Sequence, residues 1–361
     1  MRLFRKLLLI ALLAPVGALH AQEAAVDATV SVDAAAPAAA APMEPLPDLD
    51  PAQWFDGKFG GTFGAKTVTA LPKTRRVAVA GFKVVFVNHN EAHAMVRASY
   101  LPGRDTTGAK AAMIVDLEGV DAGTMQAITD AAYARFLEQL KTAGREVIPT
   151  SEMASFFAEV KSQPAPMEGS FGNAKGLVFT PTGMPLWFGA LDASWGKGGG
   201  FGGGNDVPFA KLSVALGAPI TIAPLIVVDF AQMQSSGNRS GLIARRAEAG
   251  TTLSMSVPTF STRLIRAEEV RGWGVSKGDD GGLAMTGRLD TDIEFATLVE
   301  VPKSASDGLT NAIRFIGGLG PSNKSVRKAV TTNVAYQAAA EAVLTQATGT
   351  FAKLFAQHPA P

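Results

Sequence analysis

Two histidines and a glutamate near the end of an apolar segment have a spacing that could serve a metal centre. His89, Glu91 and His93 stand at alternate positions, so on a β-strand their side chains would share one face. The helical zinc-protease pattern instead needs the glutamate directly after the first histidine, and here the glutamate is displaced. We therefore interpret the segment as a solvated loop at the end of a strand and predict no metal site.

Four aspartates late in the chain could form a second reactive group. Asp279, Asp280, Asp290 and Asp292 have the chemistry for general acid–base catalysis or for binding a divalent ion. The first pair lies between glycines, which is typical of a turn, and the second pair fits the wetter face of a strand. The glycine run 196–204 lacks the Gly-Lys-Ser/Thr ending of a phosphate-binding loop. The sequence therefore predicts no catalytic residue, no metal ligand and no cofactor.

Aromatic side chains in a glycine- and proline-rich segment are the candidates for a binding surface. Trp187, Trp195 and Phe201 are interleaved with glycine and proline within residues 165–206. Aromatic rings stack on sugars and anchor protein partners, but they fill cores equally well. We nominate these three side chains as a possible ligand or partner surface.

The first residues of the chain have the pattern of a secretory signal peptide. Basic residues precede an apolar run from Leu7 to Val16, and Ala21 stands at the expected cleavage point. The run is shorter than the ~20 residues that a helix needs to cross a bilayer. We therefore expect residues 1–21 to be removed, and the mature protein to work in the periplasm or in association with the outer membrane.

Composition excludes several classes of partner and cross-link. The chain has no cysteine, which excludes disulfides, thiolate metal sites and a lipid anchor on cysteine. Loss of the basic residues Arg2, Arg5 and Lys6 with the signal peptide changes the balance from 33 basic against 32 acidic residues to 30 against 32. That balance does not favour nucleic acid, and no later apolar run is long enough for a helical membrane span.

The mature chain divides into four segments by composition. Residues 22–72 form an Ala/Pro-rich linker and lead-in, and residues 73–163 a strand-helix-strand-helix unit. Residues 164–219 are an insertion rich in Gly, Pro and aromatic residues, and residues 220–361 hold long strands and a closing helix. Since no disulfide can join them, we expect residues 73–361 to share one hydrophobic core and form one domain.

Apolar periodicity predicts the elements of the first folded segment. Strands are expected at 76–88, 94–101, 111–120 and 145–149, a helix at 121–143 capped by Asp121, and a helix at 151–160 capped by Ser151. A helix between two strands implies a crossover connection and a partly parallel sheet.

Longer strands are expected in the second half of the chain. They span 220–233, 252–265 and 283–301, with a turn at 278–282 and a closing helix at 326–355. The predicted fold class is α/β (α+β), with a mixed, partly parallel sheet, amphipathic helices packed on it, and a long hairpin in the C-terminal half.

This order of elements resembles the envelope family that includes the curli secretion lipoprotein and the lipoprotein activators of penicillin-binding proteins. In that family a buried strand opens the domain, and a helix similar to Ile128–Gly144 (ITDAAYARFLEQLKTAG) leads into a short strand and a second helix. A late long strand and a closing helix are also similar. The resemblance covers about half the chain, and the anchor cysteine of that family is missing here. It assigns no functional residue.

These observations favour an exported, non-enzymatic bacterial-type envelope protein that acts through protein–protein interaction or self-assembly. Its expected partners are envelope proteins or copies of itself. Two alternatives remain open. One is an oligomeric pore-like or secretion-associated outer-membrane component built from long hairpins. The other is a carbohydrate-binding or hydrolytic envelope protein that uses the aromatic-rich middle around Trp187 and Trp195.

Overall fold

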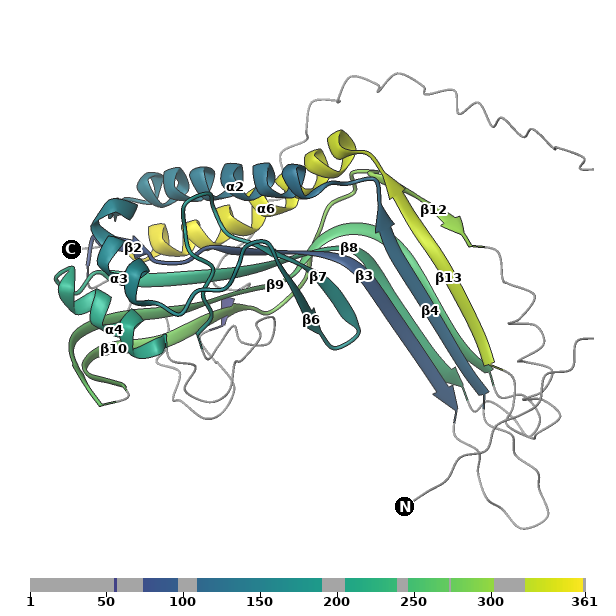
Figure 1. The fold of residues 1–361 in the computed structure, drawn as a ribbon, viewed down its shortest axis with the longest axis horizontal. Helices are drawn as coiled ribbons and strands as arrows, with labels where there is room; N and C mark the ends of the chain where they lie inside the picture. Colours follow the sequence, from purple (N-terminus) through teal and green to yellow (C-terminus); the bar gives the residue numbers. More distant parts are fainter. Residues whose placement is uncertain are drawn as a thin grey trace, which may run out of the picture. The chain divides into compact units, whose positions relative to one another are not determined.

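One mixed β-sheet organises the described part of the chain, and helices pack against it (Figure 1). The computed structural model describes residues 55–56, 74–96, 109–189, 205–238, 246–272, 274–301 and 322–359. These residues all belong to one compact unit, Pro47–Pro361.

The elements follow one another along the chain as strands with a few helices between them. The strands are β1 (Phe55–Asp56), β2 (Arg76–Val79), β3 (Lys83–Val96), β4 (Ala109–Glu118), β5 (Glu146–Val147), β6 (Met167–Phe171), β7 (Ala174–Phe179), β8 (Ile220–Asn238), β9 (Arg246–Arg271), β10 (Gly274–Met285), β11 (Leu289–Asp290), β12 (Ala296–Glu300) and β13 (Ser322–Thr331). The helices are α2 (Ala122–Thr142), the 3-10 helix η2 (Thr150–Met153), α3 (Ala154–Glu159), α4 (Asp206–Ala215) and α6 (Asn333–Gln357).

The sheet mixes parallel and antiparallel pairs, which confirms the predicted fold class. Its main path runs β1-β10-β9-β8-β3-β4-β13-β12. The parallel pairs are β2–β5, β2–β8, β3–β8 and β4–β13. The long hairpin expected around residues 278–282 corresponds to β9–β10, but the chain reverses between Arg271 and Gly274, before the predicted turn. β8 and β9 form a further long antiparallel pair.

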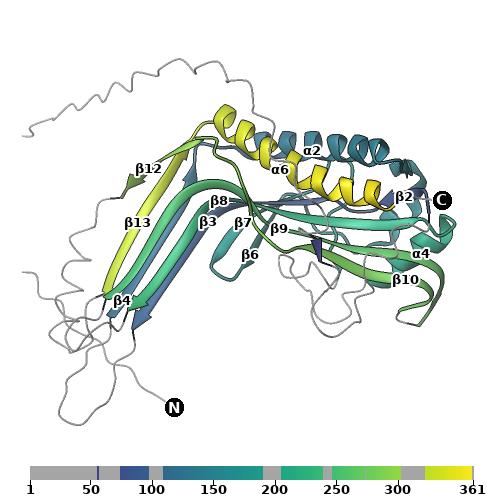
Figure 2. The same cartoon turned by 180° about the vertical axis from the view of Figure 1, so that it is seen from behind.

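Helices α2 and α6 lie side by side on one face of the sheet (Figures 1 and 2). As predicted, Asp121 caps α2, and its carboxylate accepts a hydrogen bond of 2.7 Å from the backbone N–H of Thr124. Phe136 of α2 packs between Phe82 and Phe351, with ring centroids 5.6 and 5.9 Å apart. Both helices therefore share one apolar core with the sheet.

A second, smaller core lies on the opposite face of the sheet. Alternate residues of β2 and of the position after it divide between the two cores, since Val77 and Val79 belong to the first and Ala78 and Ala80 to the second. The side chains of α3, α4 and the segment before residue 189 that fill the second core are Phe156, Trp187, Phe209, Ala210 and Leu212. The insertion predicted at 164–219 therefore contributes strands, a helix and core residues to the fold.

Several predicted boundaries in the first half are wrong. Residues 76–88 form two strands, because the chain breaks at Ala80–Phe82 before β3 begins. β3 then runs on to Val96, so the predicted strand 94–101 is in part its end, and residues 97–101 lie outside the described residues. Ser151 does not cap a helix, because it lies inside η2, which begins at Thr150 after Pro149 and has no side-chain cap.

The second half departs further from the sequence-based expectation. Residues 278–282, expected as a turn, lie inside β10, and the predicted strand 283–301 is divided among β10, β11 and β12. Residues 326–331, expected as the start of the closing helix, belong to β13, which pairs in parallel with β4. The helix begins only after Thr332, whose hydroxyl accepts from the backbone N–H of Ala335 and caps α6.

Beyond the helices, the ends of several strands form a segment that we call the arm (Figure 1). It consists of His89–Val96 of β3, Ala109–Glu118 of β4, Asp229–Asn238 of β8, Arg246–Ser256 of β9, and strands β12 and β13. The parallel pairing of β3 with β8 ends at Phe86 and Val228, and β4 pairs with β3 from His89 onward. β9 then lies against β4, so β8–β9 forms a second layer over β3–β4–β13.

Bulges mark the root of the arm, where the strands leave the helices. The pairing register of β3 against β7 shifts between Val87 and His89, and that of β8 against β9 shifts on both sides of Asp229. A bulge bends its strand and increases its twist, and β8 bends visibly at this level (Figure 2).

We predict that Phe136→Ala lowers the free energy of unfolding by about 3–5 kcal/mol, because it leaves a cavity between the helices and the sheet. Phe136 is fully buried in the first core. Urea denaturation followed by circular dichroism measures the change. The matched control is Glu138→Ala on the exposed face of the same helix, which should alter stability by no more than about 0.5 kcal/mol. A similar loss in both variants would contradict this assignment of the core.

Candidate functional site

Trp187, the first aromatic residue nominated from the sequence, is part of the second core. Only 2% of its surface is exposed, and its indole N–H donates a 2.9 Å hydrogen bond to the carbonyl oxygen of Ala80. Its ring meets Phe156 edge-on at 5.5 Å between centroids, and the ammonium of Lys83 lies 4.7 Å from its centroid. Neighbouring side chains thus cover the indole ring on which a sugar would need to stack.

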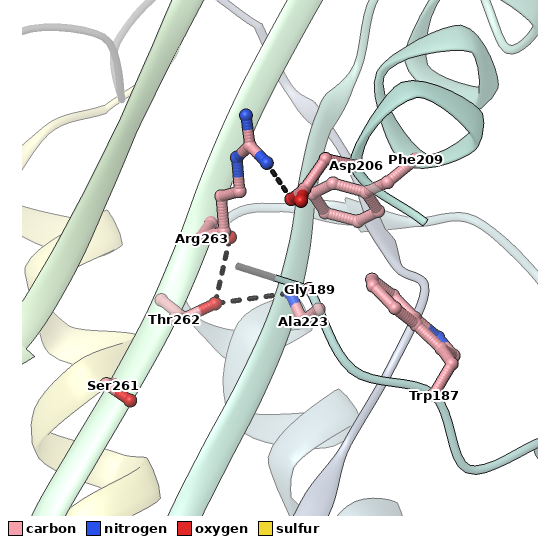
Figure 3. Close-up of a pocket in the computed structure, with 8 residues that line it drawn as sticks. All are labelled: Trp187, Gly189, Asp206, Phe209, Ala223, Ser261, Thr262 and Arg263. Atoms are coloured by element: carbon pink, nitrogen blue, oxygen red, sulfur yellow. Dashed lines mark hydrogen bonds and ion pairs between the residues drawn. The ribbon is translucent and has the colours of Figure 1, made fainter. Parts of the chain in front are cut away.

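A small pocket opens beside Trp187, and the close-up in Figure 3 shows its lining. The lining residues are Trp187, Gly189, Asp206, Phe209, Ala223, Ser261, Thr262 and Arg263. The guanidinium of Arg263 contacts the carboxylate of Asp206 and makes two hydrogen bonds, of 3.2 and 2.9 Å, with that of Asp280. Burial alone would lower the pKa of Arg263, but these two carboxylates outweigh burial and raise it. The cation is therefore already neutralised and is not available to an anionic ligand.

The other two nominated aromatics, Trp195 and Phe201, lie outside the described residues, as does the glycine run 196–204. The proposed ligand or partner surface around them stays a prediction. The part of it that the structure describes, Trp187, is enclosed.

The four aspartates considered for a carboxylate cluster are not brought together. Asp279 and Asp280 follow one another on β10 and bind different arginines of β9, Arg266 and Arg263. Asp290 accepts hydrogen bonds from Arg288 at 2.8 Å and from Ser254 of β9 at 2.9 Å, and the side chain of Asp292 is exposed. Asp279, Asp280 and Asp290 therefore each contact a side chain of β9.

His89, Glu91 and His93, in contrast, do come together. They lie on β3 and not in a loop, so the loop interpretation is wrong. The Nε2 atoms of His89 and His93 lie 3.0 and 2.9 Å from the two carboxylate oxygens of Glu91. The Nδ1 atom of His89 lies 2.6 Å from Asp116 on β4. Two imidazoles and two carboxylates thus form one hydrogen-bonded network on the outer face of the arm root.

A second polar cluster lies on the other face of β3 at the same level. The side-chain N–H of Asn90 donates a 2.7 Å hydrogen bond to Asp229 of β8. Burial raises the pKa of Asp229, although this bond, the backbone N–H of Ala231 and the charge of Arg288 all oppose the shift. The neighbouring Tyr336 is fully buried, and burial together with the charge of Asp229 raises its pKa. Asn90 of β3 and Asp229 of β8 thus meet at the root of the arm, and Tyr336 belongs to α6.

The arm has one apolar and one polar face in each layer. Residues that point between the layers are small or apolar and buried, including Ala92, Met113, Val115 and Ala231. Residues that alternate with them are polar and exposed or partly exposed, including His93, Asp116, Gln232, Gln234 and Thr252. This alternation has a period of two, which is the pattern expected of strands that have water on one face and an apolar layer on the other.

The described ranges contain neither a metal-binding group of side chains nor a helix that could span a membrane. No group of three or more His, Asp or Glu side chains there is arranged to hold a metal ion. Within the same ranges, every helix falls short of the length and apolar character needed to cross a membrane.

Sequence reasoning missed the partners that turn these residues into networks. Asp116 is 27 positions from His89, and Asp229 is 139 positions from Asn90. A signal was present for Asp229, because it is an isolated carboxylate in the apolar run Ile220–Phe230. Such a residue must find a hydrogen-bonding partner when the run is buried.

Comparisons with protein-family models, with curated proteins and with solved structures give no match for this chain.

We predict that Asp229→Asn makes the protein progressively more stable than the wild type as the pH rises. A carboxyl whose pKa is raised by folding favours the folded state at low pH, and that advantage is lost as the pH passes the folded pKa. Asparagine keeps the oxygen that accepts from Asn90 and Ala231 but has no charge to desolvate. Denaturant titrations at about pH 5 and about pH 7 measure the difference.

The control is Asp290→Asn, whose side chain is 44% exposed and which should show no comparable change with pH. A gap between Asp229→Asn and the wild type that is constant or shrinks with rising pH would show that Asp229 is not desolvated in the folded protein.

Proposed function

We propose that the protein is an exported, non-enzymatic envelope protein that acts by binding protein partners or further copies of itself. The sequence supports this proposal through the signal peptide at residues 1–21 and the Ala/Pro-rich linker at 22–72. The described structure supports it through the open edge of the arm.

The observation that carries the proposal is the edge strand β12. Among the described strands, β12 pairs only with β13. The N–H of Val301 donates to the carbonyl of Val326 on β13, so in an antiparallel ladder the N–H of Glu300 points the opposite way, away from β13. An edge that presents unpaired N–H and C=O groups can accept a strand from another chain.

Exposed valines accompany this edge and would add apolar contact to the strand pairing. Val299 of β12 is 46% exposed, Val330 of β13 is 41% exposed, and Val334 in the first turn of α6 is 70% exposed. Val299 pairs with Lys328, which lies two positions before Val330 on β13. Paired residues and residues two positions apart share a face, so Val299 and Val330 lie on the same face of the sheet. An added strand at the edge would cover apolar surface as well as backbone groups.

A second candidate, an oligomeric pore-like outer-membrane component, is favoured by the alternation along the arm. β4 and β13 each have 10 residues, close to the ~9–11 that a strand needs to cross a bilayer. In such an assembly the apolar faces, which meet one another in this structure, would turn to lipid, and the polar faces would line water. Self-association at the edge of the arm would be the first step in both candidates.

We predict that Glu300→Pro reduces self-association or partner binding, because proline removes the outward N–H and obstructs an incoming strand. The side chain of Glu300 is exposed, so the fold should tolerate the change. Native mass spectrometry and co-purification from periplasmic extract, with the mature chain as reference, provide the measurement.

The matched control is Glu300→Thr, which removes the same charge but keeps the N–H and favours a strand. Assembly retained in Glu300→Thr and lost in Glu300→Pro supports strand addition. A mature wild-type protein that is a strict monomer and captures no partner would contradict the proposed function.

We predict for the pore-like candidate that part of the exported protein fractionates with outer membranes and resists extraction by salt. Met113→Asp should abolish that fraction, because it places a charge on the buried apolar face of β4. Gln234→Asp on the polar face is the control and should leave it intact. Recovery of all wild-type protein in the soluble fraction would eliminate this candidate while leaving partner binding open.

A further inference from the structure

The network at the root of the arm joins two strands through hydrogen bonds between imidazole and carboxylate side chains. His89 lies between two carboxylates, with Nδ1 2.6 Å from Asp116 and Nε2 3.0 Å from Glu91. His93 reaches the second oxygen of Glu91 at 2.9 Å. The side chain of His89 is 19% exposed and that of Glu91 28% exposed, so both keep some contact with water.

Whether this geometry is favourable depends on how many protons the imidazole of His89 carries. Both carboxylates are acceptors when ionised, and a neutral imidazole carries one N–H and one lone pair. A neutral His89 can therefore donate to Asp116 or to Glu91, but its other ring nitrogen then opposes the lone pairs of the remaining carboxylate. Only the imidazolium form, with two N–H groups, satisfies both contacts at once. His93 has no such conflict, because it uses a single ring nitrogen.

The charged groups around the network do not supply the missing proton. On β7, Lys175 is the residue opposite His89 in the register. On β13, Lys328 is the residue opposite Asp116, and its ammonium binds Glu118 of β4 at 2.7 Å. On the other face of β3, Asn90 donates to Asp229. The contacts described for these groups place no second donor between His89 and either carboxylate.

We propose that His89, Glu91, His93 and Asp116 form an acid-strengthened clasp, in which protonation of His89 fastens β4 to β3 at the root of the arm and loss of that proton loosens the β3–β4 pairing. The clasp is a conformational device built into the fold. It does not depend on the proposed function, since it concerns pairing within one chain.

The clasp has a lower pH limit as well as an upper one. Hydrogen bonds from His89 and His93 lower the pKa of Glu91. A carboxyl whose pKa is lowered by folding contributes stability above its ordinary value near 4.3, and loses it as the pH falls through the folded pKa. The clasp should therefore weaken again in stronger acid.

Hydrogen–deuterium exchange of the full mature chain tests this inference. Exchange is measured at about pH 6 and about pH 8 and divided by the intrinsic rate at each pH, so that only the structural opening of β3–β4 remains. We expect the protection of peptides covering residues 89–96 and 109–118 to be about fivefold greater at the lower pH, a modest value because the network is partly exposed. Peptides of β9 and β10 within Arg263–Gly282 serve as the internal reference.

Two variants identify the proton that matters. They are made in an Asp229→Asn background, which removes the pH dependence expected from Asp229. His89→Gln lacks the imidazole, so in this background the protection ratio between the two pH values should fall to about one. Asp116→Asn should do the same, because its amide can donate to Nδ1 and lets a neutral His89 donate to Glu91. The half-exposed position of Asp116 makes this variant a safe second choice if His89→Gln fails to fold.

The matched control is Glu118→Gln on the same strand, which breaks the pair with Lys328 but leaves the clasp intact, and it should keep the wild-type ratio. Two results would overturn the inference. One is wild-type protection that is equal at the two pH values. The other is a pH dependence that persists in both His89→Gln and Asp116→Asn when Asp229 is also replaced by Asn.

Discussion

Burial of the central strands on both faces is the constraint on which the rest of the structure depends. Every residue from Lys83 to Val87 of β3 is buried, and so is every residue from Ile220 to Val228 of β8. A strand covered on two sides needs a layer of side chains on each, which is why α2 and α6 occupy one face and α3, α4 and Trp187 the other. In a chain without cysteine, this double layer of apolar contacts holds the fold together without disulfides.

The arm begins where double burial ends. Once β3 and β8 leave the helices, one face of each meets water, and the residue pattern changes from continuous apolar to alternating. Bulges at Val87–His89 and around Asp229 bend the strands at this point and let β4 take the place of β8 beside β3. A change of neighbour leaves polar side chains at the junction, and Asn90 and Asp229 satisfy one another there.

The sequence predicted what depends on local pattern and missed what depends on register. The buried strand near residues 76–88 and the capped helix beginning at Asp121 follow from apolar runs, spacing and a cap residue. Residues 326–331 were assigned to a helix because Val, Lys, Arg and Ala suit both structures, and only the parallel pairing of β13 with β4 makes them a strand. In the same way, the sequence indicates that His89 could take part in a polar site, but Asp116 is its neighbour only because of the register between β3 and β4. The mistaken turn at 278–282 has a related cause, since Gly278, at φ +128° and against the carbonyl of Arg266, accommodates an irregularity inside β10.

His89 and Asn90 are adjacent on β3, so their side chains point to opposite faces and fasten the arm root on both sides. On the outer side, the contacts of His89 require an additional proton on the imidazole. On the inner side, Asp229 is stabilised in its protonated form because burial raises its pKa. His89 becomes a cation when protonated and Asp229 becomes neutral, yet protonation of either side chain favours the paired strands at the arm root. Mild acid should therefore strengthen the root from both faces at once, and a rise in pH should weaken it from both faces. The bulged junction thus links the ionisation of two side chains to the relative position of the arm strands, while the doubly buried strands behind it contain few groups that titrate in this range.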